Sequence, residues 1–139
     1  MKIMIQNRFD PDQVGEIKEI YHSVGWMKHS DEAIEKVFIR SDILSLAICC
    51  GKVVGVGRAL TDGVFNATIY DVVVHREYQG NGIASLIMDD LLKKLQEISC
   101  VLLISTTGNE EFYKKHGLKK VKTGMARYLN SNLADEYLE

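Results

Sequence analysis

One stretch of this chain, residues 72–92, limits the possible folds more than any other. It starts with a run of three valines, passes through a short polar link and reaches the sequence Q-G-N-G-I-A at 79–84. Apolar residues then recur at 83, 86, 87, 91, 95 and 98, which is the spacing of one helix face. The order predicts a strand, a tight turn and a helix that begins at the turn.

A glycine turn at the start of a helix is suited to binding phosphate. Glycines let the backbone approach a ligand closely, and the first-turn N–H groups, with the positive end of the helix dipole, hold anionic oxygens. We therefore predict a phosphate site formed by the loop and the start of the helix, namely Gln79, Gly80, Asn81, Gly82, Ile83, Ala84 and Ser85. The alternative is a turn that binds no ligand. A dinucleotide-binding fold is disfavoured, because Ser85 stands where its third glycine would be.

The remaining composition is that of an ordinary globular protein. With 139 residues and 46% hydrophobic content, the chain is predicted to fold as one domain, 1–139, with a sizeable core. The formal net charge of −2 gives no general attraction to nucleic acid or to a membrane surface. The three cysteines and four histidines show no metal-ligand spacing, and the N-terminus shows no signal-peptide pattern. We expect a cytoplasmic protein without a metal site.

Local signals predict the remaining elements. Asp10 followed by Pro11 opens a helix, and Ser30 can cap a second one. The sequence Asp62-Gly63 is typical of a hairpin. We predict strands at 44–50, 52–60, 65–74, 101–105 (buried) and 118–128, helices at 82–97 and 109–116, and a loose acidic tail at 130–139.

This order of elements, β-α-α-β-β-β-α-β-α-β with a short strand at the N-terminus, predicts the fold class. It is mixed α/β, with a central, mixed, mostly antiparallel twisted sheet and helices on both faces. A right-handed crossover would place strand 101–105 parallel to strand 65–74.

One acid, Asp71, interrupts the apolar sequence of the strand at 65–74. A carboxyl group in such a position must be paired, face a polar cleft or hold its proton. The last two states suit a general base, so Asp71 is our candidate. A structural aspartate that is hydrogen-bonded to its neighbours is the alternative.

Two motifs resemble those of one enzyme family. The loop at 79–84 resembles the Q/R-x-x-G-x-G/A pyrophosphate loop of the GNAT superfamily of acyl-CoA-dependent N-acetyltransferases, and F-Y-K-K-H-G-L at 112–118 resembles its later F-Y-E-K-x-G-F segment. The segments G-R-A-L-T-D at 57–62 and F-N-A-T-I-Y-D-V at 65–72 are similar to the plant plastid group, described as serotonin and protein N-acetyltransferases, and to compact bacterial relatives. Departures from the pattern are Thr107, His116 and Leu118.

The resemblance implies an enzyme that moves an acetyl group from acetyl-CoA, its cosubstrate, to a primary amine by direct attack in a ternary complex. It implies that Val72, Val73 and Val74 pair with the pantetheine arm and that the N–H of Val73 or a neighbour faces the oxyanion. It also implies that Tyr113 contacts the cofactor and is the general acid, since a phenol is protonated at neutral pH. Asp71, or water, would be the base.

The acceptor is less closely defined by the sequence. Tyr21, Trp26 and Phe65 could form the wall of an amine pocket, although aromatic residues at such spacings are also common in cores. Two alternatives stay open: an acetyltransferase for protein lysine or N-terminal amines, and a non-catalytic acyl-CoA-binding module. A homodimer is common in the family and is possible here, whereas we expect no nucleic-acid or membrane partner.

Overall fold

The structure, a computed structural model, describes residues 1–139. By their contacts the residues form two compact units, Met1–Ser105 and Thr106–Glu139, and each is treated by itself. That they fold as the single domain we expected stays a prediction. No helix in either unit combines the length and the apolar character that crossing a bilayer requires.

The first unit is built on one five-stranded sheet in the order β1-β2-β3-β4-β5. Neighbouring strands are antiparallel except β4 and β5, which are parallel as the crossover rule predicted. The predicted mixed, mostly antiparallel sheet is therefore confirmed. The strands are β1 Met4–Gln6, β2 Ile43–Cys49, β3 Lys52–Thr61, β4 Asn66–Val74 and β5 Cys100–Leu102.

The helices of the first unit begin where their capping residues predicted. Asp10 forms a capping box on a 3₁₀ turn, η1, that leads directly into the first helix. The Ser30 hydroxyl accepts the Ala33 N–H at 3.1 Å at the start of the second helix. The elements are η1 Pro11–Gln13, α1 Val14–Ser23, α2 Asp31–Arg40, η2 Arg76–Tyr78 and α3 Ile83–Lys94.

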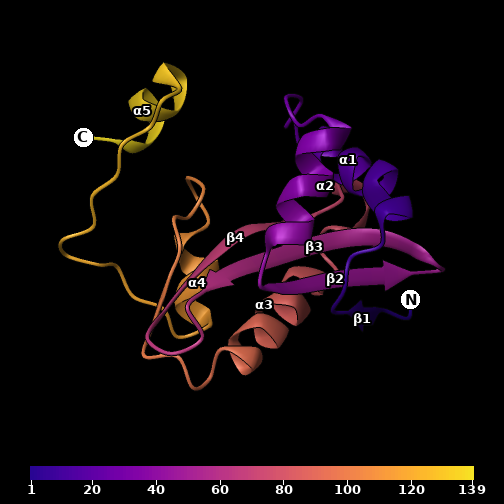
Figure 1. Ribbon diagram of the computed structural model, residues 1–139, viewed down its shortest axis with the longest axis horizontal. Helices are drawn as coiled ribbons and strands as arrows, with labels where there is room; N and C mark the ends of the chain where they lie inside the picture. Colours follow the sequence, from indigo (N-terminus) through magenta and orange to yellow (C-terminus); the bar gives the residue numbers. More distant parts are fainter. The chain divides into compact units, whose positions relative to one another are not determined.

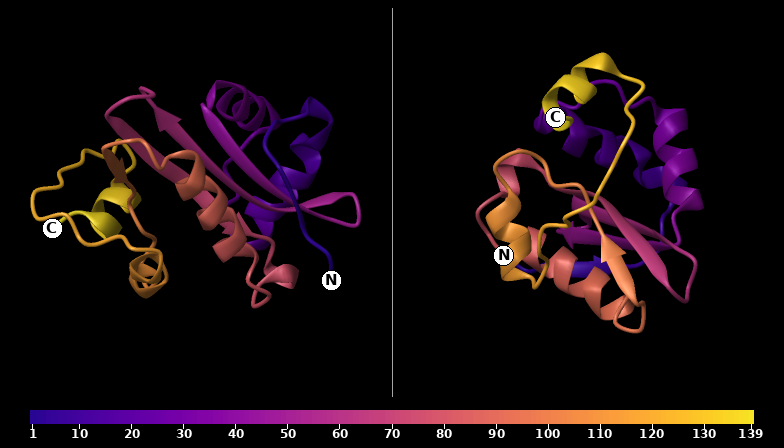
Figure 2. Two further views of the ribbon diagram at one scale, coloured as in Figure 1. Left: turned by 90° about the horizontal axis from the view of Figure 1, so that it is seen from below. Right: turned by 90° about the vertical axis from the view of Figure 1, so that its left-hand side faces the viewer.

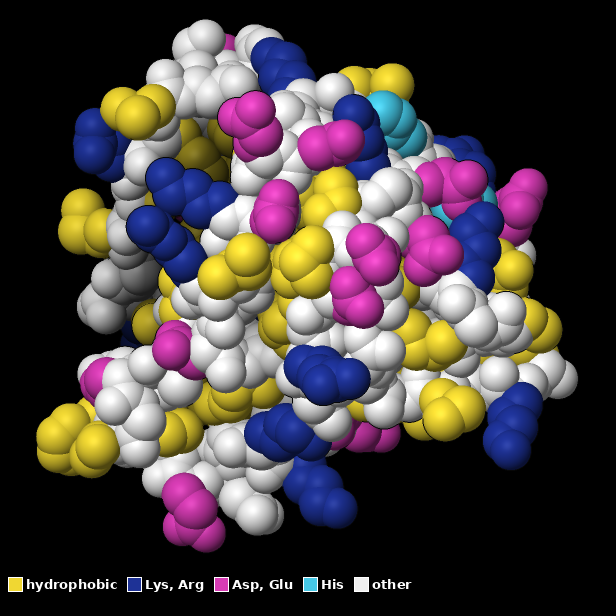
Figure 3. Space-filling view, turned by 45° about the vertical axis from the view of Figure 1, so that its right-hand side comes forward, with side chains coloured by type: hydrophobic (Ala, Val, Ile, Leu, Met, Phe, Trp, Pro, Cys, Tyr) yellow, Lys and Arg dark blue, Asp and Glu magenta, His cyan; other side chains and the backbone are white.

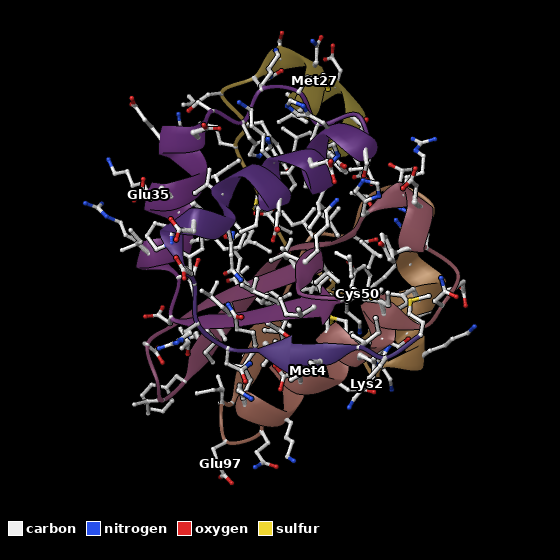
Figure 4. The ribbon with its side chains drawn as sticks, turned by 90° about the vertical axis from the view of Figure 1, so that its right-hand side faces the viewer. Lys2, Met4, Met27, Glu35, Cys50 and Glu97 are labelled. Atoms are coloured by element: carbon white, nitrogen blue, oxygen red, sulfur yellow. The ribbon has the colours of Figure 1, made fainter.

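Helices cover both faces of the sheet, as predicted. Figures 1 and 2 show α1 and α2 over one face and α3 over the other. Glu35 on α2 and Glu97, just after α3, accordingly lie on opposite sides of the strands (Figure 4). Buried residues of the first two helices pack on β2, β3 and β4 to form the main core: Ile17, Ile20, Tyr21, Ile34, Phe38, Leu46, Val53, Val56 and Val73.

The second unit differs from its prediction. It contains two short helices, α4 Glu110–Lys115 and α5 Ser131–Tyr137. The predicted strand at 118–128 is wrong, because these residues form no strand and are exposed along nearly their whole length. Several lysines and Gly124 occupy this segment, and nothing in it repeats the alternation of a half-buried strand.

Two further predictions are corrected. In place of a loose tail there is α5, whose first N–H groups bond to the Asn130 side chain, with 2.8 Å between Asn132 N and Asn130 Oδ1. The strand predicted at 101–105 is shorter, Cys100–Leu102, and both of its end residues are exposed. It lies at the edge of the five-stranded sheet, where only one neighbour covers it.

Candidate functional site

The glycine loop lies between η2 and α3, as predicted. Gly80 and Gly82 have φ values of 81° and 76°, in the left-handed region that glycine adopts most easily. Gly82 is the N-cap of α3 and supplies no side-chain acceptor for the first helical turn. The N–H groups of Ile83, Ala84 and Ser85 therefore lack a partner within their own helix.

The space over this loop is open. A Cβ atom added to Gly80 or Gly82 would have no heavy atom within 4 Å. The amides of Gln79 and Asn81 turn back onto the chain, since Gln79 Nε2 donates to Val74 O and Asn81 Nδ2 donates to Tyr78 O, both at 3.0 Å. The loop is thus held in shape by its own side chains while its backbone faces open space, which fits a pyrophosphate group.

Beside the loop, one edge of β4 is open. Pairing between β4 and β5 covers only Asn66–Thr68 against Cys100–Leu102. The edge of β4 that faces away from β3 therefore has no strand neighbour from Ile69 to Val74. An open run of peptide groups can accept an extended ligand as if it were another strand.

The direction of the peptide groups on this edge follows from one hydrogen bond. His75 N donates to Val54 O on β3 at 2.8 Å. Because successive residues of a strand point their peptide groups to opposite edges, Val73 faces β3, and Val74 and Val72 face the open edge. Of the three valines predicted to pair with a pantetheine arm, the outer two therefore have the suitable direction. The predicted oxyanion donor, the N–H of Val73 or of a neighbour, stays a prediction, and this direction favours a neighbour over Val73.

A cavity of about 120 Å³ lies under α1 and α2. It contains two of the predicted site residues, Tyr21 and Asp71, and five residues of α2 or its approach supply most of its wall. The cavity is lined by Tyr21, His29, Ala33, Ile34, Val37, Phe38, Arg58 and Asp71. It is therefore apolar on the helix side and carries an arginine and an aspartate on the sheet side.

Asp71 is paired with a cation. Arg58 Nε donates to Asp71 Oδ2 at 2.7 Å, and the two side chains are only 15% and 22% exposed. The Arg58 guanidinium also lies 4.9 Å from the ring centre of Tyr70. Of the three states open to an acid in an apolar strand, the structure therefore shows the paired one.

Tyr21 adjoins this pair from α1. Burial raises the pKa of Tyr21, and the neighbouring Asp71 charge and a hydrogen bond to Asp71 raise it further. Tyr21 consequently keeps its hydroxyl proton at neutral pH. Its ring stacks on Trp26, with centroids 5.5 Å apart, and contacts His29 at 4.5 Å.

The other two aromatic residues predicted for the amine pocket are not in the cavity lining. Trp26 stacks on the ring of Tyr21, which lines the cavity, but does not line the cavity itself. Phe65 lies in the β3–β4 hairpin and is 66% exposed. Only Tyr21 of the three therefore lines the cavity.

Tyr113 belongs to the second unit, on α4. Its ring contacts that of Phe112 edge-on, with centroids 5.1 Å apart and 77° between the planes. Burial raises the pKa of Tyr113, so its hydroxyl carries a proton at neutral pH. This state is the one that a proton donor needs.

Sequence reasoning missed Arg58 and His29. A signal for Arg58 was present, because counting back from the Asp62-Gly63 hairpin brings Arg58 opposite Tyr70, next to Asp71, as the register shows. Two opposite charges in adjacent apolar strands then indicate an ion pair. No comparable signal marks His29, which lies in the link between α1 and α2.

The comparison with protein families decides the identity of this fold. A model of the acetyltransferase (GNAT) family matches residues 9–118. The chain belongs to the GNAT acetyltransferase family. The predicted resemblance is thereby confirmed, and with it the coarser part of the predicted function, an N-acetyltransferase.

Curated relatives agree with the family. The uncharacterised N-acetyltransferase ycf52 of Porphyra purpurea is 34% identical over 116 residues, which cover 79% of this chain and 67% of that protein. Serotonin N-acetyltransferase 2 of Oryza sativa, described as chloroplastic, is 32% identical over 87 residues, or 60% of this chain and 44% of that protein. The similarity to a plant plastid group is therefore also confirmed.

Solved structures agree on the fold. A GNAT family acetyltransferase of Streptococcus pneumoniae, SP0256, superposes with a TM-score of 0.79 at 26% identity, covering 93% of this chain and 98% of that one. An acetyltransferase of Deinococcus radiodurans gives a TM-score of 0.76 at 27% identity, covering 90% and 87%. The predicted GNAT-like architecture is thus confirmed by experimentally solved relatives.

Charge is mixed on the surface shown in Figure 3. Acidic and basic side chains lie among one another on this face, with apolar patches between them. This distribution agrees with the small formal net charge of −2. The face therefore offers no extended field of one sign.

Proposed function

We propose that this GNAT protein moves an acetyl group from acetyl-CoA to a primary amine by direct attack within a ternary complex. The observation that carries the proposal is the open edge of β4, which begins after Thr68 and leads into the glycine loop. An extended thioester arm and its phosphates need those two features in that order.

The glycine loop and the open edge of β4 bind different parts of the cofactor. The N–H groups of residues 79–85 hold the pyrophosphate, with no side chain in the way at Gly80 and Gly82. Val72 and Val74 pair with the pantetheine arm, while Val73 keeps β4 attached to β3. The Val72 N–H is the donor for the oxyanion that forms when the amine attacks the thioester carbonyl.

The proton balance requires two groups. As the amine nitrogen bonds to the carbonyl carbon, its proton passes to Asp71 or to water. As the carbon–sulfur bond breaks, Tyr113 gives its proton to the departing thiolate. The role of Tyr113 rests on its sequence motif, and its hydroxyl, whose pKa is raised by burial, holds the proton to be given at neutral pH.

The cavity beside Asp71 takes the acceptor. Its 120 Å³ equals about four water molecules at liquid density. That volume suits an amino group and a few carbon atoms, with the cationic form attracted by Asp71 and by the ring of Tyr21 before it loses its proton. Both a small aliphatic amine and the end of a lysine side chain satisfy this requirement.

A panel of acceptors tests the proposal. Acetyl-CoA is combined with short alkylamines, arylalkylamines and lysine peptides of matched concentration, and thiol release is followed. We expect turnover with at least one primary amine and none with its tertiary analogue, which cannot form the amide. Acetyl-CoA binding without turnover on any amine or peptide would favour the non-catalytic module instead.

Location and assembly belong to the same proposal. Cys49, Cys50 and Cys100 are free thiols, which suits the cytoplasm or another reducing compartment. The rice relative is described as chloroplastic, so fractionation of cells is the test. A homodimer is proposed and is checked by light scattering on the purified protein.

A further inference from the structure

We infer that Arg58 is a positioning residue for the acetyl-binding edge: through Asp71 it holds a bulge in β4 that turns the Val72 peptide group towards the open edge. Asp71 then serves as an anchor, and water takes the proton of the amine. The inference rests on the proposed function, because the edge is taken to bind the thioester.

The bulge follows from the register of β3 and β4. Val56 pairs with Val73, and Arg58 pairs with Tyr70. One residue lies between the partners on β3, whereas two lie between them on β4, Asp71 and Val72. The extra residue has a φ of 55°, so Asp71 is in the left-handed region, which a side chain disfavours. A conformation of this kind persists only where its surroundings hold it.

The Arg58 side chain supplies that hold. Its Nε donates to Asp71 Oδ2, and the guanidinium is itself placed by the ring of Tyr70 and, at a longer 3.4 Å from Nη1, by Ser41 Oγ. Tyr21 reaches the same carboxylate from α1. Since the pair is largely buried, losing either partner would leave an uncompensated charge.

The bulge has a consequence for the open edge. It lies within the part of β4 that has no neighbour on this edge, which begins after Thr68, where the pairing with β5 ends. An extra residue shifts the alternation of every following residue by one. The bulge at Asp71 therefore determines that Val72 and Val74, and not Val73, face the position of the thioester.

The partners of Asp71 also argue against its use as the base. Oδ2 accepts the Arg58 N–H, and the Tyr21 hydroxyl approaches the same group. A carboxylate that anchors an arginine and a tyrosine is already engaged in structure. Taking a proton would weaken the arginine contact at the moment when the bulge must stay in place.

Three variants at one position separate the two roles. Asp71→Asn and Asp71→Gly accept a positive φ, whereas Asp71→Ala resists it. All three lack a carboxylate. We expect kcat to fall least for Asp71→Asn, whose side-chain oxygen can still accept the Arg58 N–H, and about tenfold or more for Asp71→Ala, with Asp71→Gly between them and the pH–rate profile unchanged in shape. Equal losses of about a hundredfold, with an altered pH profile, would show that Asp71 is the base and overturn the inference.

A second set of variants, which removes the charges of the pair one after the other, tests the inference even if Asp71→Ala fails to fold. Arg58→Gln leaves a buried carboxylate unpaired, and Arg58→Gln with Asp71→Asn removes that charge and restores a neutral hydrogen bond. We expect the double variant to be at least about fivefold more active than Arg58→Gln alone. A double variant no more active than the single one would contradict the positioning role.

Binding measurements distinguish failure of the inference from failure of the proposed function. Adenosine 3′,5′-bisphosphate carries phosphates but no pantetheine arm, so its affinity should be the same in Asp71→Ala and Asp71→Gly, while CoA should bind more weakly to Asp71→Ala. A wild-type protein that binds neither compound contradicts the proposed function. A wild type that binds both, with equal CoA affinity in the two variants, contradicts the inference alone.

Discussion

Gly57 on β3 lies directly against Ile87 on α3, and a Cβ atom added to Gly57 would be 2.5 Å from Ile87 Cγ2 and 3.0 Å from Leu91 Cδ1. Real Cβ atoms essentially never show the shorter distance, so Gly57→Ala must displace the Ile87 side chain or the helix that carries it. We expect a loss of ~2 kcal/mol in the free energy of unfolding, measured with urea. CoA affinity should fall as well, because α3 carries the glycine loop at its start.

The matched control is Gly15→Ala. Gly15 lies inside α1, where an added Cβ would have no neighbour within 4 Å. Alanine is the better helix former, so the free energy of unfolding should rise by ~0.5–1 kcal/mol. If both substitutions had the same effect, the close packing of Gly57 against α3 would be refuted.

Substitution of Gly82 tests the phosphate loop. Asparagine and aspartate have the same shape, and asparagine tolerates the φ of 76° at this position fairly well. Gly82→Asp adds a negative charge where the pyrophosphate should lie, so it should abolish measurable CoA binding, while Gly82→Asn should weaken it only partly. Calorimetry on both folded variants provides the comparison. Equal CoA affinities in the two would mean that no phosphate lies there.

Tyr113→Phe tests the proton donor. The change keeps the ring that contacts Phe112 and removes only the hydroxyl. We expect turnover to fall ~10²-fold or more with CoA affinity nearly unchanged. Tyr137→Phe, which removes a hydroxyl from α5 in the same unit, should leave turnover unaffected. A Tyr113→Phe enzyme within about threefold of wild type would reduce Tyr113 to a packing residue.

The structure also predicts how stability depends on pH. Burial of Asp90 raises its pKa, but hydrogen bonds from Lys94 and Asn7, each 2.8 Å long, outweigh burial, and the net effect is a lowered pKa. A lowered pKa in the folded state stabilises the protein above the unfolded-state value of 3.8, and this contribution is lost as the pH falls through the folded-state value.

Asp90→Asn should therefore reduce the urea midpoint at pH 7. The difference from wild type should shrink as the pH falls below about 4, because the wild-type carboxylate is then protonated too. A difference of the same size at neutral and acidic pH would show that Asp90 contributes by shape and not by charge.

The features that sequence predicted well are local ones. The caps at Asp10 and Ser30, the hairpin after Asp62 and the glycine loop depend on a few adjacent residues, and all of them form where expected. Their signals are strong because each meets a backbone requirement, such as an unpaired N–H group or a positive φ. The parallel crossover was also predictable, since its handedness is nearly invariant.

The features that sequence missed depend on partners elsewhere in the chain. The sequence makes Asp71 a candidate base and leaves its partner open, because the bulge next to Arg58 has no mark of its own in the sequence. The segment 118–128 was read as a strand, although a strand forms only beside another edge. Of the residues that line the cavity, the sequence predicts only Tyr21 and Asp71 as site residues. Most of the others are apolar residues of α2, and their sequence pattern is that of ordinary core residues.

The most direct test of the account is to identify both products of a single reaction. Wild-type protein is incubated with acetyl-CoA and its best amine acceptor, and mass spectrometry and a thiol reagent quantify the acetylated amine and free CoA. We predict equal amounts of the two, and neither with Gly82→Asp. Release of CoA without an acetylated amine, or no release with any acceptor while acetyl-CoA binds, would contradict the assignment of acetyl transfer to this site.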